Sequence, residues 1–122
     1  MPRDHPLAKK EKICAKDLTG LPLFCSEQSW RTDIPRWCGG HMDQLHLEGS
    51  FSLSYNASLF VKERLGYLLT FEHLIDTSPA SGLAFRPLSP RLESKMYLVW
   101  KKYQVFTPIA ERLLDSLKEK MK

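Results

Sequence analysis

Residues 81–106 read Ser81-Gly-Leu-Ala-Phe-Arg-Pro-Leu-Ser-Pro-Arg-Leu-Glu-Ser-Lys-Met-Tyr-Leu-Val-Trp-Lys-Lys-Tyr-Gln-Val-Phe106, and this stretch decides how the chain folds. Two short apolar runs lie on either side of a connection that contains Pro87, Ser89 and Pro90. The apolar residues are Leu83, Phe85 and Leu88 in the first run and Met96, Leu98 and Trp100 in the second. Runs of this kind around a proline-stiffened connection predict a pair of antiparallel strands.

A helix is predicted to follow, from about residue 107 to residue 121. Thr107 can accept a hydrogen bond from an early amide of this helix, and Pro108 takes a position where no amide partner is needed. Apolar side chains recur at helical spacing, at Ile109, Leu113, Leu114, Leu117 and Met121. Burying them would contribute roughly 8–15 kcal/mol as an upper bound. We therefore expect the helix to dock on another surface.

Upstream of this stretch, strand-like and helix-like segments alternate. The patterns predict strands at residues 21–25, 44–54 and 67–71, and helices at about 27–38 and 56–64. Apolar residues share one face of the first helix, namely Trp30, Ile34, Trp37 and Cys38. Pro35 leaves open a later start for that helix, near Thr32 or Asp33. The alternation is typical of an α/β fold, a three-layer sandwich with a mostly parallel sheet.

Several local features are predicted within this pattern. Gly49 is expected to introduce a bulge in the second strand, and a short helical turn is expected at residues 72–75. Asp17 is expected to cap one helical turn that ends at Gly20. The second helix is expected to turn three apolar residues inward, Leu59, Phe60 and Val61. Residues 1–12 are polar and carry two prolines, so we expect an extended arm there.

Size and composition narrow the class of protein. A chain of 122 residues with 43% hydrophobic residues is expected to form one domain. Its apolar runs are far shorter than the roughly 20 residues of a membrane span, and its first residues lack the apolar core of a signal peptide. Three widely spaced cysteines fit a reducing compartment, so we expect a cytoplasmic protein without membrane contact. The net charge of +4 is mild and favours solvated charge over a nucleic-acid surface.

Motifs for common enzyme chemistry do not occur in the sequence. No phosphate loop, dinucleotide glycine fingerprint or Gly-x-Ser-x-Gly elbow is present, so we expect no enzyme and no cofactor. A metal site could be suggested at Cys38, His41, Asp43 and His46, but the spacing matches no common zinc pattern. A nucleophilic pair of Cys25 with His41 or His46 is disfavoured, because a cysteine in an apolar strand has no activating charge.

Polar side chains gather where predicted strands end. Ser52, Ser54, Tyr55, Asn56 and Ser58 lie where the second strand passes into a helix, Ser26 follows the first strand, and Thr70 lies at the end of the third. Open amides and the positive end of the helix dipole favour an anion or a carboxylate at such a junction. Ligands of open α/β sheets collect beyond the carboxyl ends of the strands. The alternative is that Ser54 or Asn56 merely caps its helix.

Over nearly its whole length, the chain resembles the effector-binding domain of LysR-type transcriptional regulators. The matching pieces include Asp4-His-Pro-Leu-Ala-Lys-Lys, Asp17-Leu-Thr-Gly-Leu-Pro-Leu, the region around Leu65-Gly66-Tyr67, Phe85-Arg-Pro-Leu-Ser-Pro, and Tyr97-Leu-Val-Trp-Lys-Lys running into residues 107–117. The resemblance implies a type II periplasmic-binding-protein-like fold, in which two α/β lobes hold a small molecule in the cleft between them. It also implies an effector site at Ser26, Ser54, Tyr55, Asn56 and Thr70.

The resemblance further implies that this is a partial domain. Residues from about 12 to 78 would form the second lobe, and residues from about 83 to 122 would form the return strand and final helix of the first lobe. DNA would be bound only through a missing N-terminal winged helix-turn-helix. Without the first lobe, apolar residues of the last helix and strand would be exposed, so we expect a homodimer or higher oligomer, with exchanged C-terminal elements as one arrangement. The rival interpretations are a solute-binding lobe of a transport system and an enzyme on the same fold.

Overall fold

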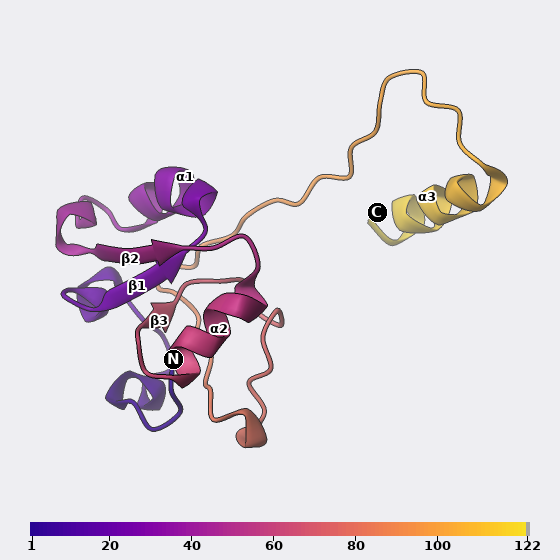
Figure 1. Ribbon diagram of the computed structural model, residues 1–122. Helices are drawn as coiled ribbons and strands as arrows, with labels where there is room; N and C mark the ends of the chain where they lie inside the picture. Colours follow the sequence, from indigo (N-terminus) through magenta and orange to yellow (C-terminus); the bar gives the residue numbers. More distant parts are fainter. Residues whose placement is uncertain (122) are drawn as a thin grey trace.

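The computed structural model describes residues 1–121, and its centre is a three-stranded parallel sheet (Figure 1). The strands are β1 (Pro22–Cys25), β2 (His46–Ser50) and β3 (Tyr67–Leu68), in the order β2-β1-β3. The α-helices in residues 1–121 are α1 (Glu27–Trp37), α2 (Ser54–Lys62) and α3 (Pro108–Met121). Four short 3-10 helices, at Pro6–Lys9, Ala15–Leu18, Met42–Gln44 and Pro79–Ser81, complete the described part. The predicted α/β architecture with a parallel sheet is confirmed.

The central strand β1 separates two packing environments because its side chains alternate between the faces of the sheet. Leu23 and Cys25 are buried on the face that packs with α1. Phe24 points to the other face, where its ring lies 5.5 Å from the ring of Phe60 in α2. Helices therefore lie on both sides of the strand, as a layered α/β fold requires.

Two glycines make room for the ring of Phe24. A Cβ atom on Gly66 would lie 2.6 Å from the carbonyl oxygen of Pro22, and a Cβ atom on Gly49 would lie 3.1 Å from the Phe24 ring. The pairing of β1 with β2 shifts at this point, since Leu23 pairs with Leu47 and Phe24 pairs with Gly49. Glu48 is the extra residue, so the bulge predicted at Gly49 is confirmed.

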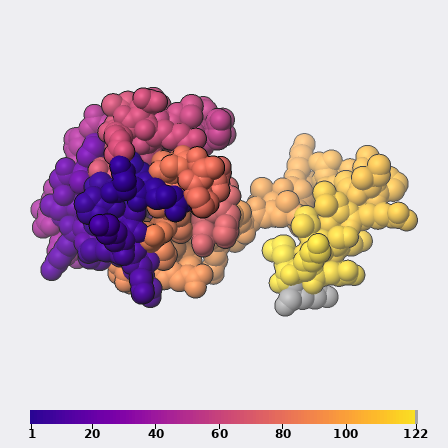
Figure 2. Space-filling view, turned by 90° about the horizontal axis from the view of Figure 1, so that it is seen from below, coloured from indigo at the N-terminus to yellow at the C-terminus, as the bar shows by residue number. Residues whose placement is uncertain are grey.

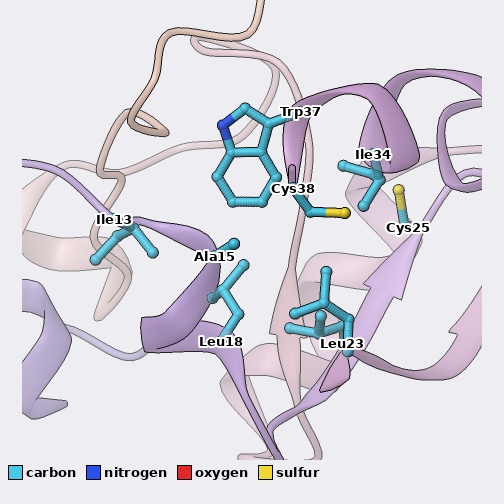
Figure 3. Close-up of a cluster of buried hydrophobic side chains, with 9 residues drawn as sticks. Ile13, Ala15, Leu18, Leu23, Cys25, Ile34, Trp37 and Cys38 are labelled. Carbon is cyan, nitrogen blue, oxygen red and sulfur yellow. The ribbon is translucent and has the colours of Figure 1, made fainter. Parts of the chain in front are cut away.

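The main core lies between β1, α1 and two connecting segments (Figure 3). Its buried members are Ile13, Ala15, Leu18, Leu23, Cys25, Ile34, Trp37, Cys38 and Leu45. The predicted face of α1 is confirmed, with Ile34, Trp37 and Cys38 buried and Trp30 half-buried against this cluster. The later start that Pro35 left open is not observed, because Ser26 caps the helix and its Oγ accepts a hydrogen bond from the amide of Ser29 at 3.3 Å.

The other local predictions give a mixed result. Helix α2 begins at Ser54, two residues before the expected start, and of the three residues expected inside only Val61 is buried. Leu59 and Phe60 are exposed over nearly half of their surface, 44% and 49%. Residues 72–75 form a turn and a bend, so the helical turn expected there is wrong. A helical turn does form, but it spans Ala15–Leu18 with Cys14 at its N-cap, so the capping position expected for Asp17 is wrong. Asp17 lies inside the turn, and its carboxylate accepts a hydrogen bond from the amide of Cys14.

The prediction of an extended N-terminal arm was wrong. Ala8 and Ile13 are buried, and Met1 and Leu7 pack against the core. The Arg86 side chain fixes this segment, because it donates hydrogen bonds to the carbonyl oxygens of Ala8 and Lys10. Long-range contacts of this kind give no local pattern in the sequence.

The antiparallel pair predicted from residues 83–88 and 96–100 does not form. The first run pairs with the N-terminal segment instead: Leu83 bridges Pro2 in antiparallel, and Leu88 bridges Ile13 in parallel. The amide of Ser89 donates to the carbonyl of Ile13 at 2.7 Å, so the backbone groups that a hairpin needs are already used. Residues 91–107 contain no strand. After the part that lines the cavity, up to Lys95, the chain runs away from the sheet domain (Figure 1).

The last helix, α3, has the bounds that its pattern predicts. The Oγ1 atom of Thr107 accepts a hydrogen bond from the amide of Ala110 at 3.3 Å, as expected for an N-cap. The helix stands apart from the sheet domain, joined to it by the extended connection (Figures 1 and 2). Ile109, Leu113 and Met121 are exposed, so the expected docking surface is not found within residues 1–121. No helix in this range is both long and apolar enough to cross a membrane.

Candidate functional site

A cavity of about 860 Å³ lies beyond the carboxyl ends of the three parallel strands. Each strand contributes the residues that directly follow it or lie close to its end: Ser26 after β1, Ser52 and Ser54 after β2, and Thr70 after β3. Apolar residues of the N-terminal segment and of the return segment (residues 83–95) close the other sides. The cavity therefore has a rim of hydroxyl groups at the strand ends, and its other sides carry apolar side chains together with charged side chains of the return segment.

The hydroxyl groups of Ser54 and Thr70 join two elements at this rim. Their oxygen atoms lie 2.7 Å apart, which is a hydrogen bond between the first residue of α2 and the segment after β3. The N-cap of α2 is Leu53, which offers no side-chain acceptor. The first amides of a helix have no partner within it, and of the residues in the first turn of α2 Ser54 lines the cavity whereas Tyr55 and Asn56 do not. The dipole of the helix favours a negatively charged group at this place.

Helix α1 begins at the same rim. Ser26 lies on the cavity and is also the N-cap of α1. Ser29, one turn later, lines the cavity as well. Two helices thus start beside one cavity, and each brings at least one hydroxyl group to it.

The residues predicted for the site are only partly brought together. Ser26, Ser54 and Thr70 line the cavity. Tyr55 and Asn56 are exposed in the first turn of α2, with 68% of Tyr55 accessible, and neither lines the cavity. The alternative of a simple capping role for Ser54 or Asn56 does not apply, because the N-cap of α2 is Leu53.

Further lining residues were not predicted. Ser29 could have been found, because it lies three residues after Ser26 on the same helix. Arg91 and Ser94 could not, because they reach the cavity only through the course of the return segment. This segment is held to α1 by two hydrogen bonds: Trp37 Nε1 donates to the carbonyl of Pro90 at 2.7 Å, and Ser94 donates to Asp33 at 3.2 Å.

The charged side chains around the cavity balance one another. Three are acidic and three are basic, namely Asp33, Glu72 and Glu93 against Arg86, Arg91 and Lys95. Part of this charge is already paired, since the Arg91 and Glu93 side chains lie 2.9 Å apart. The charged side chains that line the cavity therefore add no net charge to it.

Cys25 lies on the cavity wall, but its environment does not activate it. Burial raises the pKa of its thiol to about 11, so the thiol is neutral near pH 7. This argues against the nucleophilic pair considered with His41 or His46. Within residues 1–121, no three His, Cys, Asp or Glu side chains lie close enough together to hold a metal ion, and the suggested set at Cys38, His41, Asp43 and His46 is included in that statement.

A parallel sheet with helices on both faces is an α/β arrangement of the type II periplasmic-binding-protein kind, and ligands of open α/β sheets bind at the carboxyl ends of the strands, where the cavity lies. The family model of the LysR substrate binding domain matches residues 1–122, and the chain belongs to this family. Membership gives it an effector-sensing role in transcription regulation. No curated protein and no solved structure matches the chain.

Proposed function

We propose that the chain binds a small anionic effector in the cavity at the carboxyl ends of β1, β2 and β3. The observation that carries this proposal is the junction of Ser54 and Thr70, where a bonded pair of hydroxyl groups lies beside the uncapped start of α2. A carboxylate there can accept hydrogen bonds from amides and hydroxyl groups while the apolar wall packs on the rest of the molecule.

The assignment of roles along the chain follows from the same proposal. Ser26, Ser54 and Thr70 contact the effector from the cavity rim, while Tyr55 and Asn56 lie in the exposed first turn of α2, outside the cavity lining. Residues from about 12 to 78 act as the second lobe, and residues from about 83 to 122 provide the return strand and final helix of the first lobe. In the whole regulator, which acts in the cytoplasm as a homodimer or higher oligomer, a winged helix-turn-helix contacts DNA. Effector binding then changes the arrangement of the subunits.

Isothermal titration calorimetry of the chain with small carboxylates, such as acetate, benzoate and succinate, tests the binding proposal. The neutral amides of the same acids serve as controls for charge. At least one carboxylate is expected to bind, with its amide much weaker. Ser54→Ala and Thr70→Val are each expected to weaken binding about two- to tenfold, the effect of one lost hydrogen bond.

Ser50→Ala is the matched control, because Ser50 is exposed at the end of β2 and does not line the cavity. It is expected to leave binding unchanged. Equal binding of acids and amides, or an affinity that Ser54→Ala and Thr70→Val leave unchanged, would overturn the anionic site.

A further inference from the structure

Asp33 brings a carboxylate to the cavity from the same face of α1 as the two serines at the start of that helix. Ser26, Ser29 and Asp33 all line the cavity, and the intervals of three and four residues between them are those of one helix face. Seven residues of helix rise by about 10 Å, so Asp33 lies about 10 Å from Ser26 along α1. Hydroxyl groups therefore lie at one end of this face and a negative charge at the other.

Asp33 is less exposed to water than the other acidic side chains around the cavity. Glu72, Glu93 and Arg91 expose between 64% and 84% of their side chains, and Lys95 is also exposed. The side chain of Asp33 exposes only 21%. Because a charge that is partly removed from water acts more strongly on its neighbours, Asp33 is the acidic group with the greatest influence inside the cavity.

The nearby arginines leave the charge of Asp33 open to a ligand. Arg86 is half-buried, but its three side-chain nitrogens already donate hydrogen bonds to three backbone carbonyl oxygens. The ion pair of Asp33 is with Arg36, at 3.2 Å, and 68% of the Arg36 side chain is exposed. An ion pair with so exposed a partner contributes little free energy, so a cation inside the cavity can compete with it.

The Asp33 carboxylate also has room for further donors. Arg36 donates to its Oδ1 atom and the Ser94 hydroxyl donates to its Oδ2 atom, each at 3.2 Å. A carboxylate accepts about four hydrogen bonds, so about two acceptor positions remain. Burial raises the pKa of the Cys25 thiol on the cavity wall, and the negative charge of Asp33 adds to this rise. The charge of Asp33 therefore acts on the cavity itself.

We propose that the effector is a zwitterion, with its carboxylate at Ser54 and Thr70 and an ammonium group, several carbon atoms away, at Asp33. This inference rests on the proposed function, which supplies the carboxylate site. A six-carbon ω-amino acid is about 7 Å long when extended. A charge-assisted hydrogen bond adds about 2.8 Å at each end, which brings the reach to about 12–13 Å. The rise along α1 from Ser26 to Asp33 lies within this reach, and apolar side chains of the cavity can pack on the methylene groups between the two ends.

Calorimetric titration of the 122-residue chain with 6-aminohexanoate and with heptanoate tests this proposal. In heptanoate a methyl group takes the place of the ammonium group, so the two acids have nearly the same size. We expect 6-aminohexanoate to bind about five- to twentyfold more tightly, because it adds a charge-assisted hydrogen bond in a partly exposed site. Asp33→Asn is expected to remove this preference, since the amide keeps an acceptor oxygen but carries no charge.

Asp43→Asn is the matched control, because Asp43 is exposed and does not line the cavity. It should leave the preference for 6-aminohexanoate unchanged. Circular dichroism shows whether Asp33→Asn keeps its fold, and the comparison of the two acids on the unmodified chain needs no variant.

The outcomes separate the ammonium site from the carboxylate site. Equal binding of the two acids to the unmodified chain would overturn the ammonium site and leave the carboxylate site in place. A preference that folded Asp33→Asn retains would do the same, and would mean that Asp33 serves only to hold the return segment through Ser94. No binding of either acid would overturn both sites. A preference that Asp33→Asn removes, together with weaker binding of both acids to Ser54→Ala, would support both.

Discussion

The side-chain oxygens of Ser54 and Thr70 lie 2.7 Å apart although the residues are separated by sixteen positions in the sequence. This hydrogen bond ties the start of α2 to the segment that follows β3, at the rim of the cavity. The two hydroxyl groups come from different elements, so the bond joins parts of the chain that are distant in sequence. Their pairing links the fold of the lobe to the geometry of its proposed site.

Removal of this bond should lower stability by an amount that a double-mutant cycle can isolate. Ser54→Ala and Thr70→Val are each expected to lower the free energy of unfolding by about 0.5–1.5 kcal/mol. The double variant should lose less than the sum of the two, because the second change has no bond left to break. Urea denaturation measures these values, with exposed Thr19→Val as control. Strict additivity would show that the two hydroxyl groups do not interact.

Gly66 is expected to be one of the least replaceable residues of the sheet domain. A Cβ atom there meets the Pro22 carbonyl at 2.6 Å, and backbone cannot move as easily as a side chain. Gly66→Ala should lower the free energy of unfolding by about 1–3 kcal/mol. Gly49→Ala should cost less, since its Cβ meets only the Phe24 ring, at 3.1 Å. Thermal unfolding shows which of the two variants is less stable. A lower stability of Gly49→Ala than of Gly66→Ala would contradict the packing described around Phe24.

Arg86 is expected to hold the N-terminal segment in place. Its guanidinium group donates to the carbonyl oxygens of Ala8 and Lys10, and Arg86→Met leaves these acceptors without their partner. Arg86→Met should lower the free energy of unfolding by about 1–3 kcal/mol. Arg31→Met is the control, because Arg31 is exposed on α1. Hydrogen exchange should show faster exchange at residues 8–13, and unchanged protection there would mean that the apolar contacts alone fix the segment.

Acid should weaken the turn at Ala15–Leu18 through Asp17. Hydrogen bonds from Lys10 and from the Cys14 amide lower the pKa of the Asp17 carboxyl from 3.8 to about 2. A lowered pKa means that the carboxylate form stabilises the folded chain above about pH 4, and that this contribution is lost as the pH falls towards 2.

Asp17→Asn should therefore be less stable than the unmodified chain at pH 7, by about 1–2 kcal/mol once the partial exposure of Lys10 is taken into account. The difference should shrink between pH 4 and pH 2, as urea titrations at several pH values would show. A difference that is constant over this range would rule out the carboxylate as its source.

The sequence predicts the parts of the fold that depend on local patterns. The capped helix from Pro108, the buried face of α1 and the bulge at Gly49 follow from spacing, capping residues and a single glycine. Ser26, Ser54 and Thr70 could be predicted as cavity residues because parallel strands bring their carboxyl ends to one edge. These features need no knowledge of distant contacts.

The features that the sequence does not predict depend on contacts between segments that are distant in the sequence. The run at residues 83–88 was expected to pair with the run that follows it, but Ile13 and Pro2 take its backbone groups. The composition of residues 1–12 suggests a solvated segment. Arg86 nevertheless donates hydrogen bonds to the carbonyls of Ala8 and Lys10, and Arg3 donates one to the carbonyl of Leu83. The contribution of Arg91 and Ser94 to the cavity follows from the same course of the chain.

The most direct test of the central claim is to locate a bound anion on the chain. A ¹H–¹⁵N correlation spectrum, recorded while a small carboxylate such as benzoate is added, reports each backbone amide separately. The account predicts that the largest saturable shifts occur at the starts of α1 and α2 and at Thr70, with the amides of α3 unchanged. Saturable shifts confined to other surfaces, or no saturable shift with any carboxylate that calorimetry shows to bind, would contradict an effector site at the carboxyl ends of the sheet.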